Sequence, residues 1–213
     1  MSPQGLRLTL VRHGQTASNV VRALDSRPPG PPLTELGRSQ ATALAERLAG
    51  DPVTAVYAST AVRAQQTAAP VAAVHRLDVQ VLDGVHEIFI GDLENRADVV
   101  ARERFEAVYA AWHQGDLDAR LPGGESAREL RERFVPAVES VTAAGTGTIV
   151  LVSHGAAVRL GAAALLGDTA ETAYLANTGI VVLQAVDGGW QLEHWDPAPP
   201  RPGDVTAGGG PGA

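Results

Sequence analysis

Two segments of the chain end in a histidine followed by a glycine, and each histidine comes at the end of an apolar run. Residues 8–11 lead into Arg12 and His13, and residues 148–152 lead through a serine into His154. Apolar runs of this length are typical of buried strands, and glycine marks the turn that ends them. Ligands of open α/β sheets bind beyond the carboxyl ends of the strands. The sequence therefore predicts that a cation and two imidazoles meet at one sheet edge.

A helix expected over residues 61–74 carries a further candidate, Arg63, in its first turn. It follows a short apolar strand expected at residues 53–58, and we expect Ser59 and Thr60 to cap it. A cation in the first turn can point back toward the sheet edge, where the positive end of the helix dipole also favours an anion. Isolated arginines are most often solvated surface residues, so position alone does not assign Arg63 to the site.

These candidates belong to a longer ordered pattern. It runs through Leu10-Val11-Arg12-His13-Gly14-Gln15-Thr16 with Asn19, Pro32-Leu33-Thr34-Glu35-Leu36-Gly37 with Gln40-Ala41, residues 59–67, Glu87, Pro122-Gly123-Gly124-Glu125-Ser126 and Ser153-His154-Gly155. Over about residues 12 to 186 the pattern resembles the histidine phosphatase superfamily, in its cofactor-dependent phosphoglycerate mutase-like branch. The resemblance implies an α/β fold: a three-layer α/β/α sandwich with a mostly parallel central sheet, helices on both faces and a helical or loop lid insertion.

The resemblance also implies a role for each site residue. His13 is the expected nucleophile, because a neutral imidazole nitrogen can attack phosphorus and form a covalent phosphohistidine. Its ring needs orienting, and we expect its other nitrogen to donate to a nearby backbone carbonyl. Glu87 is expected to protonate the leaving alkoxide and then to deprotonate the attacking water. The phosphate is expected to be held by Arg12, Asn19, Arg63 and His154.

We expect neither a metal nor a cofactor. Transferred phosphoryl groups need cationic stabilisation, which two arginines and a histidine can supply here in place of Mg²⁺. His86 and Glu87 begin like the motif of a zinc-protease helix, but Ile88, Phe89 and Ile90 follow, so the second histidine is missing. The obvious metal-binding interpretation therefore fails.

The residues after Glu87 separate two kinds of enzyme. In phosphoglycerate mutases of this family an arginine and, shortly after, a tyrosine follow the glutamate and read the phosphoglycerate. Here Ile88 and Phe89 follow, and Ser18 stands where a tryptophan is common. Apolar side chains cannot hold a carboxylate or a second phosphate. We therefore expect hydrolysis of a small phosphomonoester; the alternatives are a mutase-type phosphotransferase and a non-catalytic phospho-ligand-binding protein. A protein phosphohistidine phosphatase is disfavoured, because such members are more compact.

Asp25 is a further departure from the family, since related phosphatases often carry glutamine or another neutral residue there. A carboxylate that pointed inward would repel a phosphate unless it met a cationic part of the ligand. We expect Asp25 to face outward. The identity of the substrate is expected to depend on residues 20–32, including a Pro- and Gly-rich surface loop near the mouth of the site, and on residues 84–125.

The rest of the chain alternates helices and strands. Thr34 is expected to cap a helix over residues 35–49, and Pro136 to kink or break a later helix. Further strands are expected at 78–82, 180–185 and 190–195, the last two as a hairpin, and further helices at 97–114, 125–142 and 156–166. We expect a single domain over 1–196, with residues 84–125 as the lid, and a disordered Pro/Gly-rich tail over 197–213.

Composition narrows the function classes. The chain has 213 residues, enough for the core of one domain, and all of its 17 basic residues are arginine. Without lysine, Schiff-base chemistry, a Walker-type lysine and a Ser-Lys dyad are excluded. The net charge of −7 disfavours a nucleic-acid partner, and no apolar run reaches the roughly 18 residues of a membrane span. The expected partner is a small phosphorylated metabolite, and the expected state is a monomer or homodimer.

The expected location is the cytoplasm. The chain contains no cysteine, and residues 1–20 lack the charged, then apolar, then small-residue order of a secretory leader. Abundant alanine, glycine, valine, proline and arginine suggest a bacterial genome rich in G and C.

Overall fold

A six-stranded sheet forms the middle of the protein in the computed structural model, which describes residues 5–143, 145–167 and 174–196. Its strands are β1 (Arg7–Arg12), β2 (Val53–Ala58), β3 (Val79–Val81), β4 (Thr148–Ser153), β5 (Ile180–Val186) and β6 (Gly189–Asp196), in the order β3-β2-β4-β1-β5-β6. The first four are mutually parallel, whereas β5 and β6 form an antiparallel hairpin at one edge. The predicted mostly parallel sheet and the predicted hairpin are confirmed.

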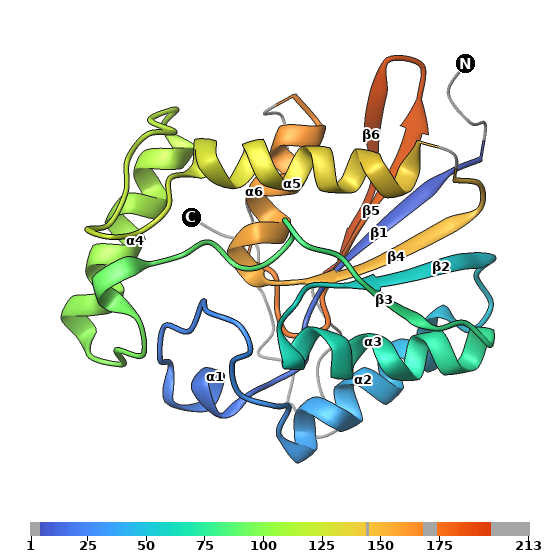
Figure 1. The fold of residues 1–213 in the computed structure, drawn as a ribbon, viewed down its shortest axis with the longest axis horizontal. Coiled ribbons are helices and arrows are strands. Elements are labelled where there is room, and N and C mark those ends of the chain that lie inside the picture. Colours follow the sequence, from blue (N-terminus) through green and yellow to red (C-terminus); the bar gives the residue numbers. More distant parts are fainter. Residues whose placement is uncertain (1–4, 144, 168–173, 197–213) are drawn as a thin grey trace, which may run out of the picture.

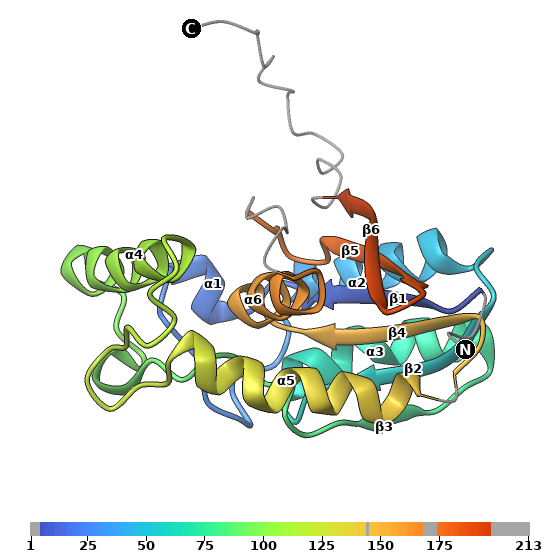
Figure 2. The ribbon, with the colours of Figure 1, turned by 90° about the horizontal axis from the view of Figure 1, so that it is seen from above.

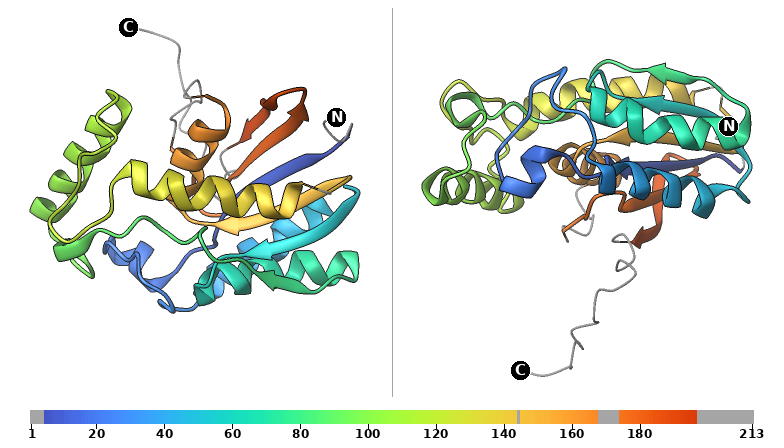
Figure 3. Two further views of the ribbon diagram at one scale, coloured as in Figure 1. Left: turned by 45° about the horizontal axis from the view of Figure 1, so that its top comes forward. Right: turned by 90° about the horizontal axis from the view of Figure 1, so that it is seen from below.

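Helices cover both faces of this sheet (Figure 1). One face carries α2 (Glu35–Leu48) and α3 (Val62–His75), and the other carries α5 (Ala127–Thr142) and α6 (Gly155–Leu165). Figure 2 shows the sheet from the side of α5 and α6, and the right view of Figure 3 from the side of α2 and α3. The predicted three-layer α/β/α class is therefore confirmed.

Alternating side chains of the central strands divide the core between the two faces. In β4, Ile149 and Leu151 pack with α5 and α6, whereas Val150 and Val152 pack with α2 and α3. All four are buried, which fits a continuous apolar run in a parallel strand with a helix layer on each side. This packing fixes the register of the strands, and with it the point where each strand ends.

The parallel register of β1 and β4 brings the two histidine-bearing ends together. Arg12 pairs with Ser153, and the backbone N–H of His13 donates to the Ser153 carbonyl at 3.0 Å. After His13 the chain passes very close to α2, where a Cβ on Gly37 would lie 2.1 Å from the Gln15 carbonyl oxygen. His13 and His154 therefore leave the sheet side by side.

Two local predictions about helices are wrong. Neither Ser59 nor Thr60 caps α3: its N-cap residue is Ala61, without a side-chain cap. The Ser59 hydroxyl bonds to His154 at 2.7 Å and accepts only a long bond, at 3.4 Å, from the Ala61 N–H. Of the two outcomes predicted for Pro136, a kink or a break, the break is wrong, because α5 runs without interruption to Thr142. Pro136 is exposed to solvent, so water can donate to the carbonyl one turn earlier, which has no N–H donor at Pro136. The buried side chains of Leu130, Phe134 and Val138 stabilise the helix on its other face.

The insertion between β3 and α5 lies beyond the ends of the strands (Figure 1). It contains a short 3₁₀ helix, η1 (Gly91–Leu93), and α4 (Val99–His113), which pack through a small apolar cluster of their own. A short helix that the sequence analysis missed, α1 (Ala17–Val21), follows β1. No helix in the described ranges is long and apolar enough to cross a membrane. The predicted tail, 197–213, lies outside the described residues.

Candidate active site

The imidazole of His13 is held in one tautomer at the end of β1. Its Nδ1 lies 2.7 Å from the Gly14 carbonyl oxygen, which can only accept, so Nδ1 carries the proton and Nε2 carries the lone pair. Burial lowers the pKa of His13 well below its usual range, and the charges of Arg63 and Arg12 lower it further. His13 therefore presents a neutral, oriented nitrogen. The predicted bond to a backbone carbonyl is confirmed.

Arg63 lies behind His13, fully buried, in the first turn of α3. Its Nε donates to His13 Nε2 at 3.2 Å, and its Nη2 donates to the Asp25 carbonyl at 3.2 Å. The loop that contains Gly30 lies directly against this guanidinium. A Cβ on Gly30, whose φ is +65°, would lie 2.1 Å from Nη1. Burial lowers the pKa of Arg63, while neighbouring carboxylates, Asp25 first, raise it.

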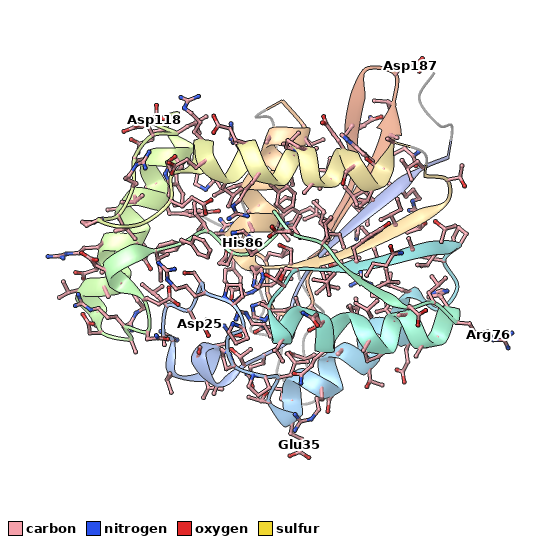
Figure 4. All side chains as sticks on the ribbon, viewed as in Figure 1. Asp25, Glu35, Arg76, His86, Asp118 and Asp187 are labelled. Atoms are coloured by element: carbon pink, nitrogen blue, oxygen red, sulfur yellow. The ribbon has the colours of Figure 1, made fainter. Side chains whose placement is uncertain are left out.

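Asp25 faces the site, so the expectation that it points outward is wrong. Its side chain is 9% exposed, and Oδ1 lies 3.4 Å from Nη1 of Arg63. Oδ2 accepts from the Ser18 hydroxyl at 2.8 Å. Figure 4 shows Asp25 inside the molecule, in contrast to Asp118 and Asp187 at its outer edge. The expected repulsion is relieved by an ion pair within the protein, an arrangement that the sequence analysis did not consider.

Arg12 is the last residue of β1, and Asn19 lies in α1. Nη1 of Arg12 donates to the Leu175 carbonyl at 2.7 Å and to the Tyr174 hydroxyl at 3.1 Å. The side-chain oxygen of Asn19 accepts from the Thr16 N–H at 3.1 Å and from Asn177 at 3.2 Å. Because that oxygen is engaged, the amide NH₂ is the group that Asn19 can offer to a ligand.

The carboxylate of Glu87 sits on the N-terminus of α6. Oε1 accepts from the backbone N–H of Ile88 at 2.9 Å and of Ala157 at 2.8 Å, and Oε2 accepts from that of Ala156 at 3.1 Å. A helix N-terminus is a favourable place for an anion. Glu87 is thus fixed to the same helix that begins directly after His154.

His154 is fully buried beside His13, with ring centroids 5.1 Å apart. Its Nε2 bonds to the Ser59 hydroxyl at 2.7 Å. Its Nδ1 has no hydrogen-bond partner among the described residues, which leaves that nitrogen for a ligand. Burial lowers the pKa of His154 well below its usual range, and the nearby Arg63 lowers it further.

These side chains surround a cavity of about 210 Å³. Four of the six predicted site residues line it, namely Arg12, His13, Asn19 and Glu87, whereas Arg63 and His154 are buried in contact with His13. Residues from both segments that were expected to decide the substrate also line the cavity; these are Ala23, Leu24, Asp25, Ser26, Ile88, Ile90, Phe105 and Tyr109. The structure therefore brings all six predicted residues into one place.

Several residues of the site were not found from the sequence. Asn177 donates to the His13 carbonyl at 2.9 Å as well as to Asn19, and Arg159 of α6 lines the cavity with its guanidinium 4.5 Å from the centre of the Tyr109 ring. The signal for Asn177 is its place just before β5, whose antiparallel pairing with β1 returns the chain to the site. Within the described ranges, no three His, Cys, Asp or Glu side chains cluster to hold a metal.

Comparison with known proteins identifies the family. The model of the histidine phosphatase superfamily (branch 1) matches residues 8–197. The chain belongs to the histidine phosphatase superfamily. The resemblance inferred from the motifs is therefore confirmed, and membership makes the chain an enzyme of the phosphatase or mutase type.

Individual relatives of the superfamily differ in name and length. The chain is 32% identical to PE-PGRS family protein PE_PGRS11 of Mycobacterium tuberculosis, over 95% of this chain but only 38% of that protein. It is 32% identical to a protein named "Probable phosphoglycerate mutase GpmB" of Proteus mirabilis, over 89% of this chain and 90% of that one. The structure of a mycobacterial glucosyl-3-phosphoglycerate phosphatase with VO3 matches with a TM-score of 0.80 and 28% identity, over 90% of this chain and 99% of that one.

Proposed function

We propose that the chain is a phosphatase that hydrolyses a small phosphomonoester through a phosphohistidine intermediate on His13. The observation that carries the proposal is the state of this imidazole: Nδ1–H is fixed on the Gly14 carbonyl, and the Nε2 lone pair is oriented toward the guanidinium of Arg63, from which it accepts a hydrogen bond. A neutral, oriented nucleophile beside fixed cations is what attack on a phosphoryl group requires.

In the first step, His13 Nε2 forms a bond to phosphorus and the ester P–O bond breaks. Arg12 and the NH₂ of Asn19 hold the phosphoryl oxygens from the cavity. Arg63, whose Nε gives up its bond to Nε2, and His154 Nδ1 hold them next to His13. The leaving alkoxide takes a proton from Glu87. We assign that proton to Oε2, because Oε2 accepts one backbone N–H whereas Oε1 accepts two. The alcohol then leaves.

In the second step, water attacks phosphorus and the P–N bond to His13 breaks. Glu87, now ionised, takes a proton from the water, so the carboxyl group returns to its starting state. Nε2 recovers its lone pair, and inorganic phosphate leaves. No charge needs to be supplied beyond that of the chain's own cations.

Hydrolysis is favoured over transfer by the residues that follow Glu87. Ile88 lines the cavity and is buried, and the Phe89 ring stacks on His86 with centroids 4.8 Å apart. Neither side chain can bind the carboxylate of a phosphoglycerate. The likeness to the glucosyl-3-phosphoglycerate phosphatase supports hydrolysis as well.

The expected cytoplasmic location, the extent of the domain over 1–196 and a monomeric or homodimeric state stay predictions.

A mutase-type phosphotransferase is the second candidate, because the Proteus mirabilis relative carries that name over 90% of its length. A mutase has to keep its intermediate bound and return the phosphoryl group to another hydroxyl. Labelled 3-phosphoglycerate that appears as the 2-isomer would establish this function in place of hydrolysis.

The test is turnover in EDTA of p-nitrophenyl phosphate and a panel of sugar and glycerate phosphates. His13→Ala should lower turnover by at least about 10³-fold, because removing a nucleophile removes the covalent route. His194→Ala is the matched control, since His194 lies on β6 and is 55% exposed. Equal turnover by wild type and His13→Ala would refute the proposed function.

A further inference from the structure

The segment that carries Glu87 has no regular secondary structure to hold it. Residues 84–90 form neither helix nor strand, so their carbonyls have no ladder partners. Four consecutive carbonyls are instead bound by side chains. The Ser153 hydroxyl donates to the Val85 carbonyl at 2.6 Å. A single arginine of α5, Arg133, donates to the carbonyls of Gly84, His86 and Glu87.

Arg133 uses both terminal nitrogens for this purpose. Nη1 donates to the carbonyls of Gly84 at 2.7 Å and His86 at 2.9 Å, and Nη2 donates to that of Glu87 at 3.1 Å. The fork is held in place by a two-pronged ion pair with Glu125, at 2.6 Å from Nε and 2.8 Å from Nη2. Both side chains are mostly buried, at 16% and 12% exposed, so water competes little for these bonds.

Glu125 holds the other end of the same segment. Its Oε2 accepts from the Phe89 N–H at 3.2 Å, and its own N–H donates to the Phe89 carbonyl at 2.7 Å. The Arg133–Glu125 pair therefore fixes the backbone on both sides of Glu87. The carboxylate itself is held by the N-terminus of α6 and by the Ile88 N–H.

We infer that Arg133 is a positioning residue for Glu87, which sets where the proton donor stands relative to the ester oxygen. The inference rests on the proposed function, in which Glu87 protonates the leaving group. A misplacement of about 1 Å in a catalytic group can cost about 10²-fold in rate. Loss of the fork removes bonds to three carbonyls of this segment, whereas none of the hydrogen bonds described above for His13 and the phosphate-binding residues involves Arg133.

The experiment compares kcat/KM for two esters, because this quantity reports the step in which the P–O bond breaks. p-Nitrophenolate leaves without a proton, whereas an alkoxide such as that of a glycerol phosphate needs one. Arg133→Met should lower kcat/KM by about 10²-fold for the alkyl ester and by less than about threefold for the aryl ester. Arg133→Lys keeps the charge but loses the fork, so its kcat/KM for the alkyl ester should lie between the values of the wild type and of Arg133→Met.

Arg128→Met is the matched control. Arg128 also lies on α5 and forms a two-pronged pair, with Asp118, but both side chains are more than half exposed. We expect no selective loss for the alkyl ester. If Arg133→Met fails to fold, as judged by urea unfolding, Glu125→Gln takes its place, because it weakens the pair and keeps its shape; the same preference for the aryl ester is expected.

The outcomes distinguish this inference from the proposed function. Equal losses for the two esters in the Arg133 variants, together with an unequal loss in Glu87→Gln, would overturn the positioning role alone. An equal loss in Glu87→Gln would overturn the role of Glu87 as proton donor and the inference with it. Absence of His13-dependent turnover would overturn the proposed function itself.

Discussion

At the scale of single residues, the charges around His13 oppose one another. Arg63 donates to the nucleophilic nitrogen with Nε and is held on its other side by the carboxylate and the carbonyl of Asp25. Asp25 also lines the cavity in which a phosphate is proposed to bind. The acid therefore aligns Arg63 and at the same time reduces the attraction of the site for anions.

Replacing Asp25 by asparagine should strengthen the binding of an anion. The variant keeps an acceptor for Ser18 and removes a negative charge beside the phosphate site. We expect the inhibition constant of inorganic phosphate to fall about tenfold, which corresponds to about 1.4 kcal/mol. Competitive inhibition of p-nitrophenyl phosphate turnover measures it. Asp118→Asn is the control, since this carboxylate is 63% exposed at the edge of the molecule; a higher constant in Asp25→Asn would show that alignment of Arg63 outweighs charge.

The orientation of Asp25 illustrates which residues of a site can be predicted. Arg12, His13 and His154 were found because each stands at the end of a strand, a position that a short stretch of sequence determines. The loop that turns Asp25 inward is held by Glu94, which accepts from the Ser26 N–H at 2.9 Å and from the Arg27 N–H at 3.2 Å. That contact joins residues far apart in the chain, so no local pattern reveals it.

At the scale of secondary-structure elements, the site depends on how closely α2 approaches the loop after β1. The Gln15 carbonyl oxygen lies 2.1 Å from the position that a Cβ of Gly37 would take, and it also accepts from Thr34 at the start of the helix. The first turn of α2 thus packs directly against the loop that follows His13. The close approach needs glycine because the contact is with backbone atoms, which cannot rotate away.

Gly37→Ala should therefore force α2 away from this loop. We expect a loss of about 2 to 3 kcal/mol in the free energy of unfolding, as for overpacking in a core, measured by urea denaturation. Gly50→Ala is the matched control, because it lies just beyond the end of the same helix with nothing within 4 Å of an added Cβ. Equal stabilities of the two variants would contradict the proposed role of the close approach.

Elements were predicted better than their ends. Apolar periodicity located every strand of the described sheet and all four helices that cover it, since burial of one face requires that pattern. The prediction of the α3 cap was wrong because Ser59 has a stronger partner in His154, which follows β4 and lies far away in the sequence. α1 was missed because five residues with no buried side chain leave no periodic signal.

At the scale of the whole molecule, the fold buries two histidines, one directly after β1 and one directly after β4. Both His13 and His154 are buried, and burial lowers the pKa of each well below its usual range. In the unfolded chain each histidine takes up a proton near pH 6.5. Below that pH the unfolded state therefore binds more protons than the folded state, and stability must fall as the pH falls.

The contribution of His154 can be separated from that of other groups. Each histidine that stays neutral in the fold lowers the free energy of unfolding by up to about 1.4 kcal/mol per pH unit below about pH 6.5. The urea midpoint of the wild type should thus fall more between about pH 7.5 and pH 5 than that of His154→Gln, which has no group to titrate there. His194→Gln should follow the wild type, because this side chain is 55% exposed. If wild type and His154→Gln lose the same stability over that range, the buried imidazole takes up its proton in the folded state, and His154 cannot be the neutral group proposed to face the phosphate.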